Sequence, residues 1–318
     1  MGLISWLTGS AAVPPEQAAR IEKAVDAIEP RIRLVGGYVG RLAPAVEAAA
    51  VYCSDLAARI PGPVEIGRAA FAADPLVHAL FASADDIGTM FAASECVRDR
   101  MAQPDFQGDG YCCALLGMRR REKAGFGVAA TGSVLRQDEP QRSLYFADHT
   151  LAEPAPDLAS ARVVIADAMF RGLLESIAFH VDEVRREVAA LRQDTAMERA
   201  RIRARAGPEA HTRHLDDLWQ RLRATADALS PEALLATLAD SLAAPERHLS
   251  LESRNLAVNR VGIIASGDAT PGAADRLEFA ELTGRDQRRW TVLLVSIDHA
   301  EALDALHRAE TARRYILL

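Results

Sequence analysis

The first part of the chain carries apolar or small residues at every third or fourth position, from Ala18 to Ile60. This spacing lines up side chains along one side of a helix, as in coiled coils and helical bundles. The stripe also contains residues that weaken or kink a helix, namely Pro30, Gly36, Gly37, Gly40 and Pro44. We therefore predict two helices at 15–29 and 31–60, or one bent helix, ended by the Pro-Gly-Pro sequence at 61–63.

Two helix starts follow this stripe. Asp74 precedes Pro75, which is the order expected of an N-cap followed by a proline in the first helical position. Ser83 and Asp86 have the spacing of a capping box, in which each side chain accepts a hydrogen bond from the backbone of the other residue. The sequence thus predicts a short helix to about residue 82 and another helix to about residue 101.

Strand patterns occupy two separate regions of the chain. The first region has strand-like runs at 111–118, 126–135 and 143–149, which predict a three-stranded meander. The second region has such runs at 248–251, 256–265, 276–283 and 289–297, with a hairpin turn expected at 284–286. Because a sheet of two or three strands is only marginally stable alone, we expect both regions to share one antiparallel sheet.

A long amphipathic helix is predicted between the two strand regions, at about 162–206. Its apolar seam comprises Val163, Ala166, Phe170, Leu173, Ile177, Val181, Val184, Val188 and Leu191, and it then thins to Thr195, Glu198 and Ile202. Gly207 and Pro208 predict a chain reversal, because glycine suits the left-handed C-cap and proline cannot continue the helix. A leucine-rich return arm begins at Leu215, so we predict a helical hairpin whose distal end is weakly packed and exposed.

Together these patterns predict the α+β class, with an N-terminal helical bundle, an antiparallel sheet that holds a long inserted helical hairpin, and a C-terminal helix capped at Asp298. The expected regions are the N-terminal helices at 1–105, the β-meander at 106–156 and the coiled-coil-like hairpin at 157–245. The last region, 246–318, completes the sheet and adds the terminal helix.

Composition narrows the function classes. A chain of 318 residues that is 49% hydrophobic can bury one or two cores without disulfides or metals. Its net charge of -7 disfavours a polyanion-binding protein, so nucleic acid is not an expected partner. No uncharged apolar run is long enough to span a membrane. The apolar start at 1–7 is expected to dock on protein, with peripheral membrane contact as the weaker alternative.

The cysteines are Cys53, Cys96, Cys112 and Cys113, and their spacing matches neither a zinc site nor a redox pair. With no secretory signal at the start of the chain, we expect a cytoplasmic protein with reduced thiols. Cys112 and Cys113 are adjacent in a predicted strand, so their side chains should point to opposite faces of the sheet.

One group of residues has metal-ligand spacing. His211, His214 and Asp217 are three positions apart, which places them on one side of a helix. An isolated pair of histidines at this spacing is common, no third ligand group is evident elsewhere and the pair lies near the hairpin tip, so exposed polar residues are the stronger interpretation. His180, beside a change of spacing in the long seam, has the same two interpretations, a buried switch or an ordinary histidine.

Arginines gather at two predicted turns, as Arg119, Arg120 and Arg121 and as Arg288 and Arg289. If both turns lay at one sheet edge, these five side chains could bind an anion together. Charged turns also keep sheet edges soluble, and this simpler interpretation is the stronger one.

No phosphate-binding loop, dinucleotide fingerprint, nucleophile elbow or metalloprotease helix is present, so no cofactor is expected and the balance lies against an enzyme. Our leading hypothesis is an interaction or assembly protein whose helical hairpin engages a protein partner or a second copy. The partner-facing residues would lie near its tip, at Thr195, Glu198, Ile202 and Leu215. The alternative is an enzyme or ligand-binding domain with a pocket between the sheet and the N-terminal helices.

Overall fold

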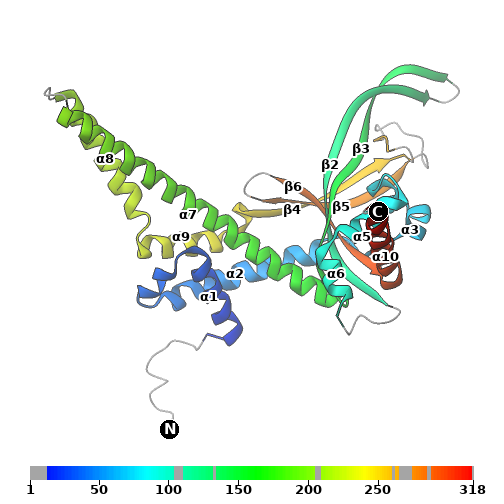
Figure 1. The fold of residues 1–318 in the computed structure, drawn as a ribbon, viewed down its shortest axis with the longest axis horizontal. Helices are drawn as coiled ribbons and strands as arrows, with labels where there is room; N and C mark the ends of the chain where they lie inside the picture. The colour runs from blue at the N-terminus through cyan, green and yellow to red at the C-terminus, as the bar shows by residue number, and fades with distance from the viewer. Residues whose placement is uncertain are drawn as a thin grey trace, which may run out of the picture. The chain divides into compact units, whose positions relative to one another are not determined.

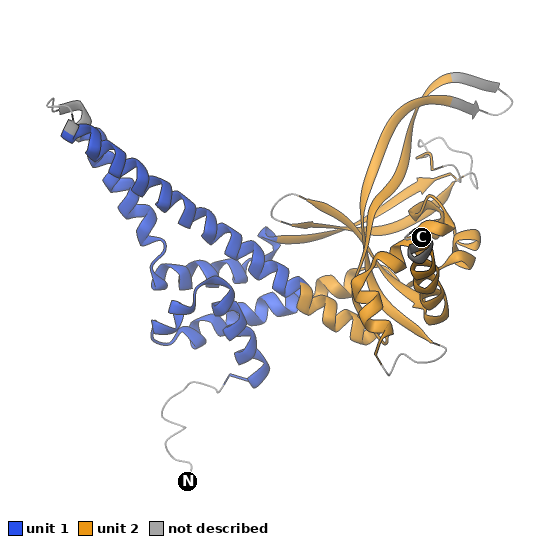
Figure 2. Ribbon diagram, in the orientation of Figure 1, with its two compact units in different colours: residues 1–53, 169–248 blue, residues 54–168, 249–318 orange. Residues whose placement is uncertain are grey.

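The chain forms two compact units of helices and strands. The computed structural model describes residues 13–103, 110–131, 134–204, 209–259, 262–264, 274–284 and 288–316. Unit 1 comprises Met1–Cys53 and Met169–His248, and unit 2 comprises Ser54–Ala168 and Leu249–Leu318 (Figure 2). Two helices, α2 (Tyr38–Arg59) and α7 (Leu158–Ala204), begin in one unit and end in the other. The apolar start at 1–7 and the expected turn at 207–208 lie outside the described residues.

The described part of unit 1 is helical (Figure 1). Its elements are α1 (Pro15–Ile28), the 3-10 helix η1 (Pro30–Leu34), the first part of α2, most of α7, α8 (Glu209–Asp227), α9 (Pro231–Ala243) and the 3-10 helix η3 (Pro245–Arg247). The predicted helix at 15–29 is confirmed, whereas the second helix starts only at Tyr38. Between them, Pro30 opens η1 and Gly37 adopts a left-handed φ of 72°, which turns the chain before α2 begins.

The predicted long helix is confirmed as α7, and α8 provides the return arm. The seam is wrong at its start, because Val163 is 62% exposed. The buried side at that end runs instead through Ala161, Ile165 and Met169, whose four-residue steps pass by Val163. A further helix, α9, begins after Ser230, whose hydroxyl accepts a hydrogen bond from the amide of Ala233 and caps the helix.

Unit 2 combines a sheet with helices. Its elements are the end of α2, β1 (Val64–Ile66), α3 (Arg68–Ala73), α4 (Pro75–Leu80), α5 (Ala84–Ala93), α6 (Glu95–Met101), β2 (Tyr111–Thr131), β3 (Val134–Ala155), the start of α7, β4 (Leu249–Val258), β5 (Asp275–Gly284), β6 (Arg289–Asp298) and α10 (His299–Ile316). The helix starts predicted at Asp74 and Ser83 are both confirmed, the second as a complete capping box with Asp86. The latter helix ends at Ala93, because Ser94 caps a new helix, α6.

One sheet joins the strands that precede and follow the helical insertion, as predicted. The strand order is β3-β2-β6-β5-β4, all antiparallel, and the short β1 adds to β6 in parallel. The three-stranded meander was wrong, because β2 and β3 are two long strands. The residues expected to form its first turn remain in the ladder, with Lys123 opposite Ser143 and Gly125 opposite Gln141. A glycine in a strand interior therefore marked no turn here.

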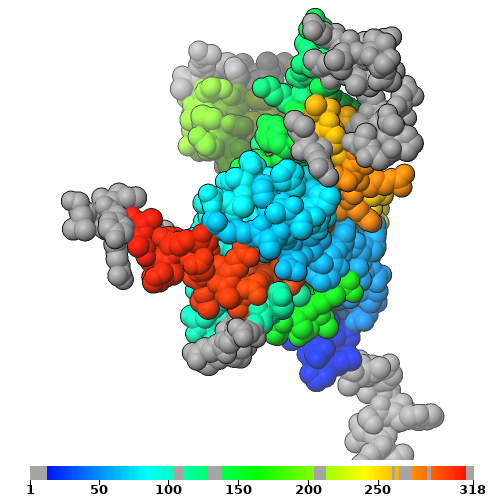
Figure 3. All heavy atoms as spheres, turned by 90° about the vertical axis from the view of Figure 1, so that its right-hand side faces the viewer, coloured from blue at the N-terminus to red at the C-terminus, as the bar shows by residue number. Residues whose placement is uncertain are grey.

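Helices α3 to α6 and α10 cover one face of the sheet (Figure 1). The core there takes alternate residues of the central strands, including Leu116 of β2, Leu293 and Val295 of β6 and Phe279 of β5. Helices α5 and α10 lie side by side on the surface (Figure 3), where a Cβ at Gly88 would sit 3.8 Å from the Cβ of Ala305. The opposite face is also buried at β6, where Val292 and Leu294 are at most 2% exposed. The α+β class is thus confirmed.

Candidate functional site

The first candidate surface is a two-stranded extension of the sheet, formed by residues 119–131 of β2 and 134–147 of β3, which we call the ribbon. Strand β2 pairs with β6 only as far as Met118, but its pairing with β3 continues to Thr131. Among the described residues, the outer edge of β3 carries one bridge, between Ser143 and Ile263. Phe126 on the ribbon is 77% exposed. Much of the ribbon thus has strand edges that pair with no other described strand, and it exposes the aromatic ring of Phe126.

The base of the ribbon continues into a chain of charges across four strands. Glu281 of β5 is central to it, because its side chain is only 4% exposed and accepts from both Arg120 and Arg254, each through Nε at 3.0 Å. Arg120 also lies 3.5 Å from Glu122, which in turn pairs with Arg142 at 3.3 Å, while Arg254 pairs with Glu252. Positive and negative side chains alternate in this network, so each has an oppositely charged neighbour. Arg120 therefore contributes to the stability of the sheet.

The other predicted anion-binding residues are distributed differently. Arg119 and Arg121 alternate with Arg120 and so lie on the opposite face, where the Arg119 guanidinium stacks 4.6 Å from the ring centroid of Trp290. Arg121 is 3.9 Å from Asp148. Arg288 and Arg289 are exposed at the start of β6. The sheet thus places Arg119 close to this end of β6, but the five arginines do not form one cluster, and anion binding by them stays a prediction.

The second candidate surface is the helical hairpin of α7 and α8 in unit 1. Its arms share a core of Val188 and Leu191 with Leu218 and Leu222, against which Trp219, Ala226 and Leu229 pack. Thr195 and Glu198, expected to be exposed, are each only 3% exposed, because the seam phase carries them to the inner side. The Thr195 hydroxyl donates a hydrogen bond to the carbonyl oxygen of Leu191, 2.6 Å from Oγ1. Packing against the return arm makes this part of the hairpin tighter than predicted.

Other residues near the tip remain accessible. Ile202 and Leu215 are half-buried, and Met197 is 44% exposed. Arg199 of α7 lies with its guanidinium 4.6 Å from the ring centroid of Trp219 of α8, which is a cation–π contact between the arms. Of the four predicted partner-facing residues, therefore, Ile202 and Leu215 are available for contact and Thr195 and Glu198 mainly support the hairpin.

The proposed metal group is only partly described. His214 and Asp217 are exposed on α8, and the His211 side chain lies outside the described residues. Within the described part of the chain, no three His, Cys, Asp or Glu side chains come close enough together to hold a metal ion. His180 is 42% exposed and lies 3.5 Å from Glu183, one turn along the helix, so the histidine has a surface contact and no buried position.

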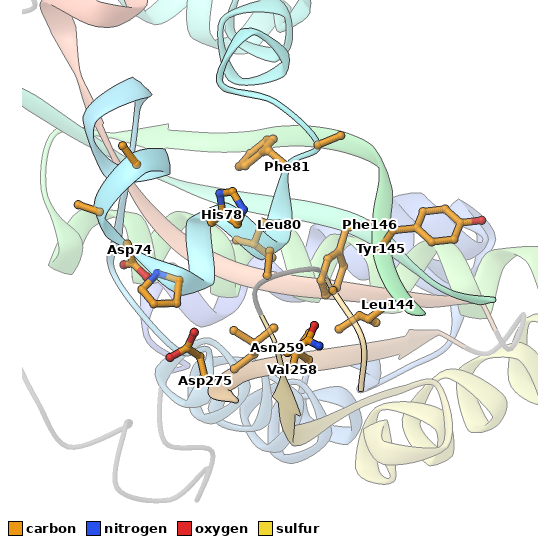
Figure 4. Close-up of a pocket in the computed structure, with 17 residues that line it drawn as sticks. Asp74, His78, Leu80, Phe81, Leu144, Tyr145, Phe146, Val258, Asn259 and Asp275 are labelled. Atoms are coloured by element: carbon orange, nitrogen blue, oxygen red, sulfur yellow. The ribbon is translucent and has the colours of Figure 1, made fainter. Parts of the chain in front are cut away.

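A pocket in unit 2 is the third candidate. Its volume is about 530 Å³, within the usual range for small-molecule sites. The segment from α3 to the end of α4 forms one wall, while β3, the end of β4 and the start of β5 form the other. Asp74 and Asp275 lie toward one end and Leu144 and Phe146 toward the other (Figure 4).

The two phenylalanines that line this pocket, Phe81 and Phe146, each pack against another aromatic side chain. The ring of Phe81 stacks on His149, with ring centroids 4.6 Å apart, and the His149 Nε2 lies 2.8 Å from the carbonyl oxygen of Leu80. Burial lowers the pKa of His149, which keeps the imidazole neutral at neutral pH. On the strand side, Phe146 meets Phe279 edge to face at 5.7 Å. Both aromatic walls are thus supported from behind.

The turn after β4 completes the rim. Asn259 Oδ1 accepts from the amide of Ile263 at 2.9 Å, and Gly262 has a left-handed φ of 82°. The Gly262 carbonyl accepts from the amide of Leu144 at 2.7 Å, which ties the turn to β3. Asp74 Oδ1 accepts from the amide of Leu76 at 2.8 Å and caps α4, so this carboxylate has a fixed position.

Comparison with known proteins adds no assignment, because no family model, curated protein or solved structure matches this chain. In the described residues, no helix combines the length and the apolar character needed to cross a membrane. Sequence reasoning missed Glu281 and the identity of the pocket residues, although a pocket between the sheet and the N-terminal helices was the expected alternative, and this pocket lies between the α3–α4 segment and the sheet. An acidic residue on the buried face of the strand at 276–283 was the available signal for Glu281, whereas the pocket walls come from segments far apart in sequence.

Proposed function

We propose that this chain is a protein–protein interaction or assembly protein that engages a partner, or a second copy of itself, through the helical hairpin of α7 and α8. The supporting observation is the core of the hairpin, in which Val188 and Leu191 are covered by Leu218 and Leu222. The two arms pack against each other along this core. They can then present their outer sides, with Met197 and Arg201 exposed, to another molecule.

The ribbon supports the same class of function. A strand with free backbone groups is a template for pairing with another chain, and such edges are commonly blunted or covered in proteins. Past Met118, the edge of β2 pairs with no described strand. Phe126 adds an exposed aromatic ring, the kind of side chain that anchors many interfaces.

Shortening the hairpin by one heptad in each arm, at 197–203 and 210–216, tests the proposal. Removing whole heptads leaves the seam in phase, so Leu191, Leu218 and Leu222 keep their positions. We expect the full chain to self-associate in light scattering, or to be cross-linked to a specific partner in its native cells. The shortened chain should lose that self-association or that partner.

A second variant separates the two surfaces. Replacing 124–142 with Asn-Gly joins Lys123 to Ser143 by a tight turn and removes most of the ribbon. If assembly and partners are unchanged in both shortened chains, the proposal is wrong. Loss in the ribbon variant alone would move the interaction surface from the helical hairpin to the ribbon.

The second candidate function is a small-ligand-binding domain, which the pocket of about 530 Å³ favours. A panel of small amines, alcohols and acids tested by thermal shift on the full chain checks this function. The absence of any stabilising compound would count against it.

A further inference from the structure

The charged side chains among the described residues that line the pocket are both carboxylates. Asp74 and Asp275 both line it, and no Lys or Arg is found among its described lining residues. His78 and Tyr145 are its remaining described titratable lining residues, and in Figure 4 the Tyr145 ring points away from the cavity. A cleft lined by carboxylates and partly enclosed by apolar walls concentrates cations.

The rest of the pocket is apolar. Six buried side chains from four different segments line it, each at most 7% exposed overall, namely Leu80, Phe81, Leu144, Phe146, Val258 and Leu277. A metal ion would leave this surface unused, and the described residues supply no group of three metal-binding side chains. The surface instead suits a hydrocarbon or aromatic body, with Phe81 and Phe146 offering ring faces or edges.

We propose that this pocket binds a small organic amine, whose ammonium group pairs with Asp74 and Asp275 and whose apolar body packs against Phe146 and Leu277. This inference rests on the second candidate function, ligand binding in the pocket. Oδ1 of Asp74 is occupied by the cap of α4, which leaves Oδ2 for a cation. Asp275 begins β5 opposite Val258, which holds its backbone in place.

Three probes of nearly equal shape test the charge requirement: tryptamine, tryptophol and indole-3-acetate. They carry an ammonium, a hydroxyl and a carboxylate on the same indole body. We expect tryptamine to bind the full chain about tenfold more tightly than tryptophol in calorimetry or ligand-observed NMR, and indole-3-acetate not to bind. Binding of tryptamine should weaken as salt is raised.

Isosteric variants locate the binding site. Asp275→Asn removes one charge, and Asp74→Asn removes the other while keeping a good N-cap. Each should weaken tryptamine binding about threefold, so that the two together account for the tenfold preference, and leave tryptophol nearly unaffected. Glu278→Gln is the matched control, because Glu278 is exposed on the same strand and does not line the pocket.

The outcomes separate the two claims. Equal binding of all three probes, or no loss in the Asp74→Asn/Asp275→Asn double variant, overturns the amine assignment but leaves a ligand pocket. If no probe binds at millimolar concentration, the amine assignment is overturned, and the thermal-shift panel on the full chain then decides the second candidate function. Circular dichroism of each variant establishes that it is folded.

Discussion

Arg120 Nε donates to Glu281 Oε1 at 3.0 Å, across the strand β6 that separates their own strands. The carboxylate is nearly enclosed, and Arg254 approaches its other oxygen at the same distance. Removing this carboxylate would leave two arginines without the acceptor that they share. This arrangement links β2, β5 and β4 through side chains as well as through the backbone ladder.

We expect Glu281→Gln to lower the free energy of unfolding by about 2–3 kcal/mol, because it leaves Arg120 and Arg254 without their shared anion. The shift of the urea midpoint measured by circular dichroism checks this value. Glu252→Gln is the control, since Glu252 is 61% exposed and its pair with Arg254 should contribute at most about 0.5 kcal/mol. Equal shifts for the two variants would contradict the role given to Glu281.

Glu29 gives a pH-dependent prediction. Hydrogen bonds from Arg31 first, and then from Arg185, lower the pKa of Glu29 from 4.5 to about 2, against the opposing effect of burial. Because the folded-state pKa is the lower one, this group stabilises the folded protein fully above about pH 4.5 and progressively less as the pH falls toward about 2. Arg185 also donates to the carbonyl of Ile28 at 3.1 Å, which joins α7 to the end of α1.

Glu29→Gln should therefore cost about 2 kcal/mol at neutral pH and clearly less at pH 3. Urea unfolding of both proteins at the two pH values measures the difference. Glu47→Gln, at an exposed position of α2, should show no such pH-dependent loss. A loss of the same size at both pH values would argue that Glu29 acts by packing alone.

Gly62 should tolerate no side chain. Its φ is 118°, and an added Cβ would lie 2.2 Å from the carbonyl oxygen of Leu294. The neighbouring carbonyl of Pro61 accepts from the Leu294 amide at 2.8 Å, so the segment cannot move away without losing that bond. Gly62→Ala should cost about 3 kcal/mol or more, read as a fall in melting temperature. Gly125→Ala, with nothing within 4 Å of the new Cβ, should have a far smaller effect.

Cys112 should be unreactive in the folded protein. Burial is the main reason that its pKa rises to about 12, so very little thiolate exists at pH 8. Alkylation by iodoacetamide should be about a thousandfold slower than for an ordinary thiol, by the thiolate fraction alone. Mass spectrometry of peptides should show Cys96, which is half-buried, modified first and Cys112 only after unfolding in urea. Modification of both at similar rates in the native protein would refute this.

Local signals in the sequence were enough for many elements. The hydroxyl of Ser83, the carboxylate of Asp74 and the proline that follows it act within a few residues of themselves, so their helix starts could be predicted and were confirmed. The shared sheet and the inserted helical hairpin also followed from the alternation and the three-to-four spacing of apolar positions. The apolar seam, however, predicted which face of α7 is apolar but not which part of the protein packs against that face.

Tertiary structure decided the rest, because pairing partners far apart in the chain leave no local trace. Arg120 is one of three consecutive arginines in the sequence, and only folding selects it for Glu281. Thr195 and Glu198 are buried because a return arm of the same chain covers that side of α7. The pocket carboxylates of Asp74 and Asp275 belong to segments two hundred residues apart, brought together by the packing of α4 on the sheet.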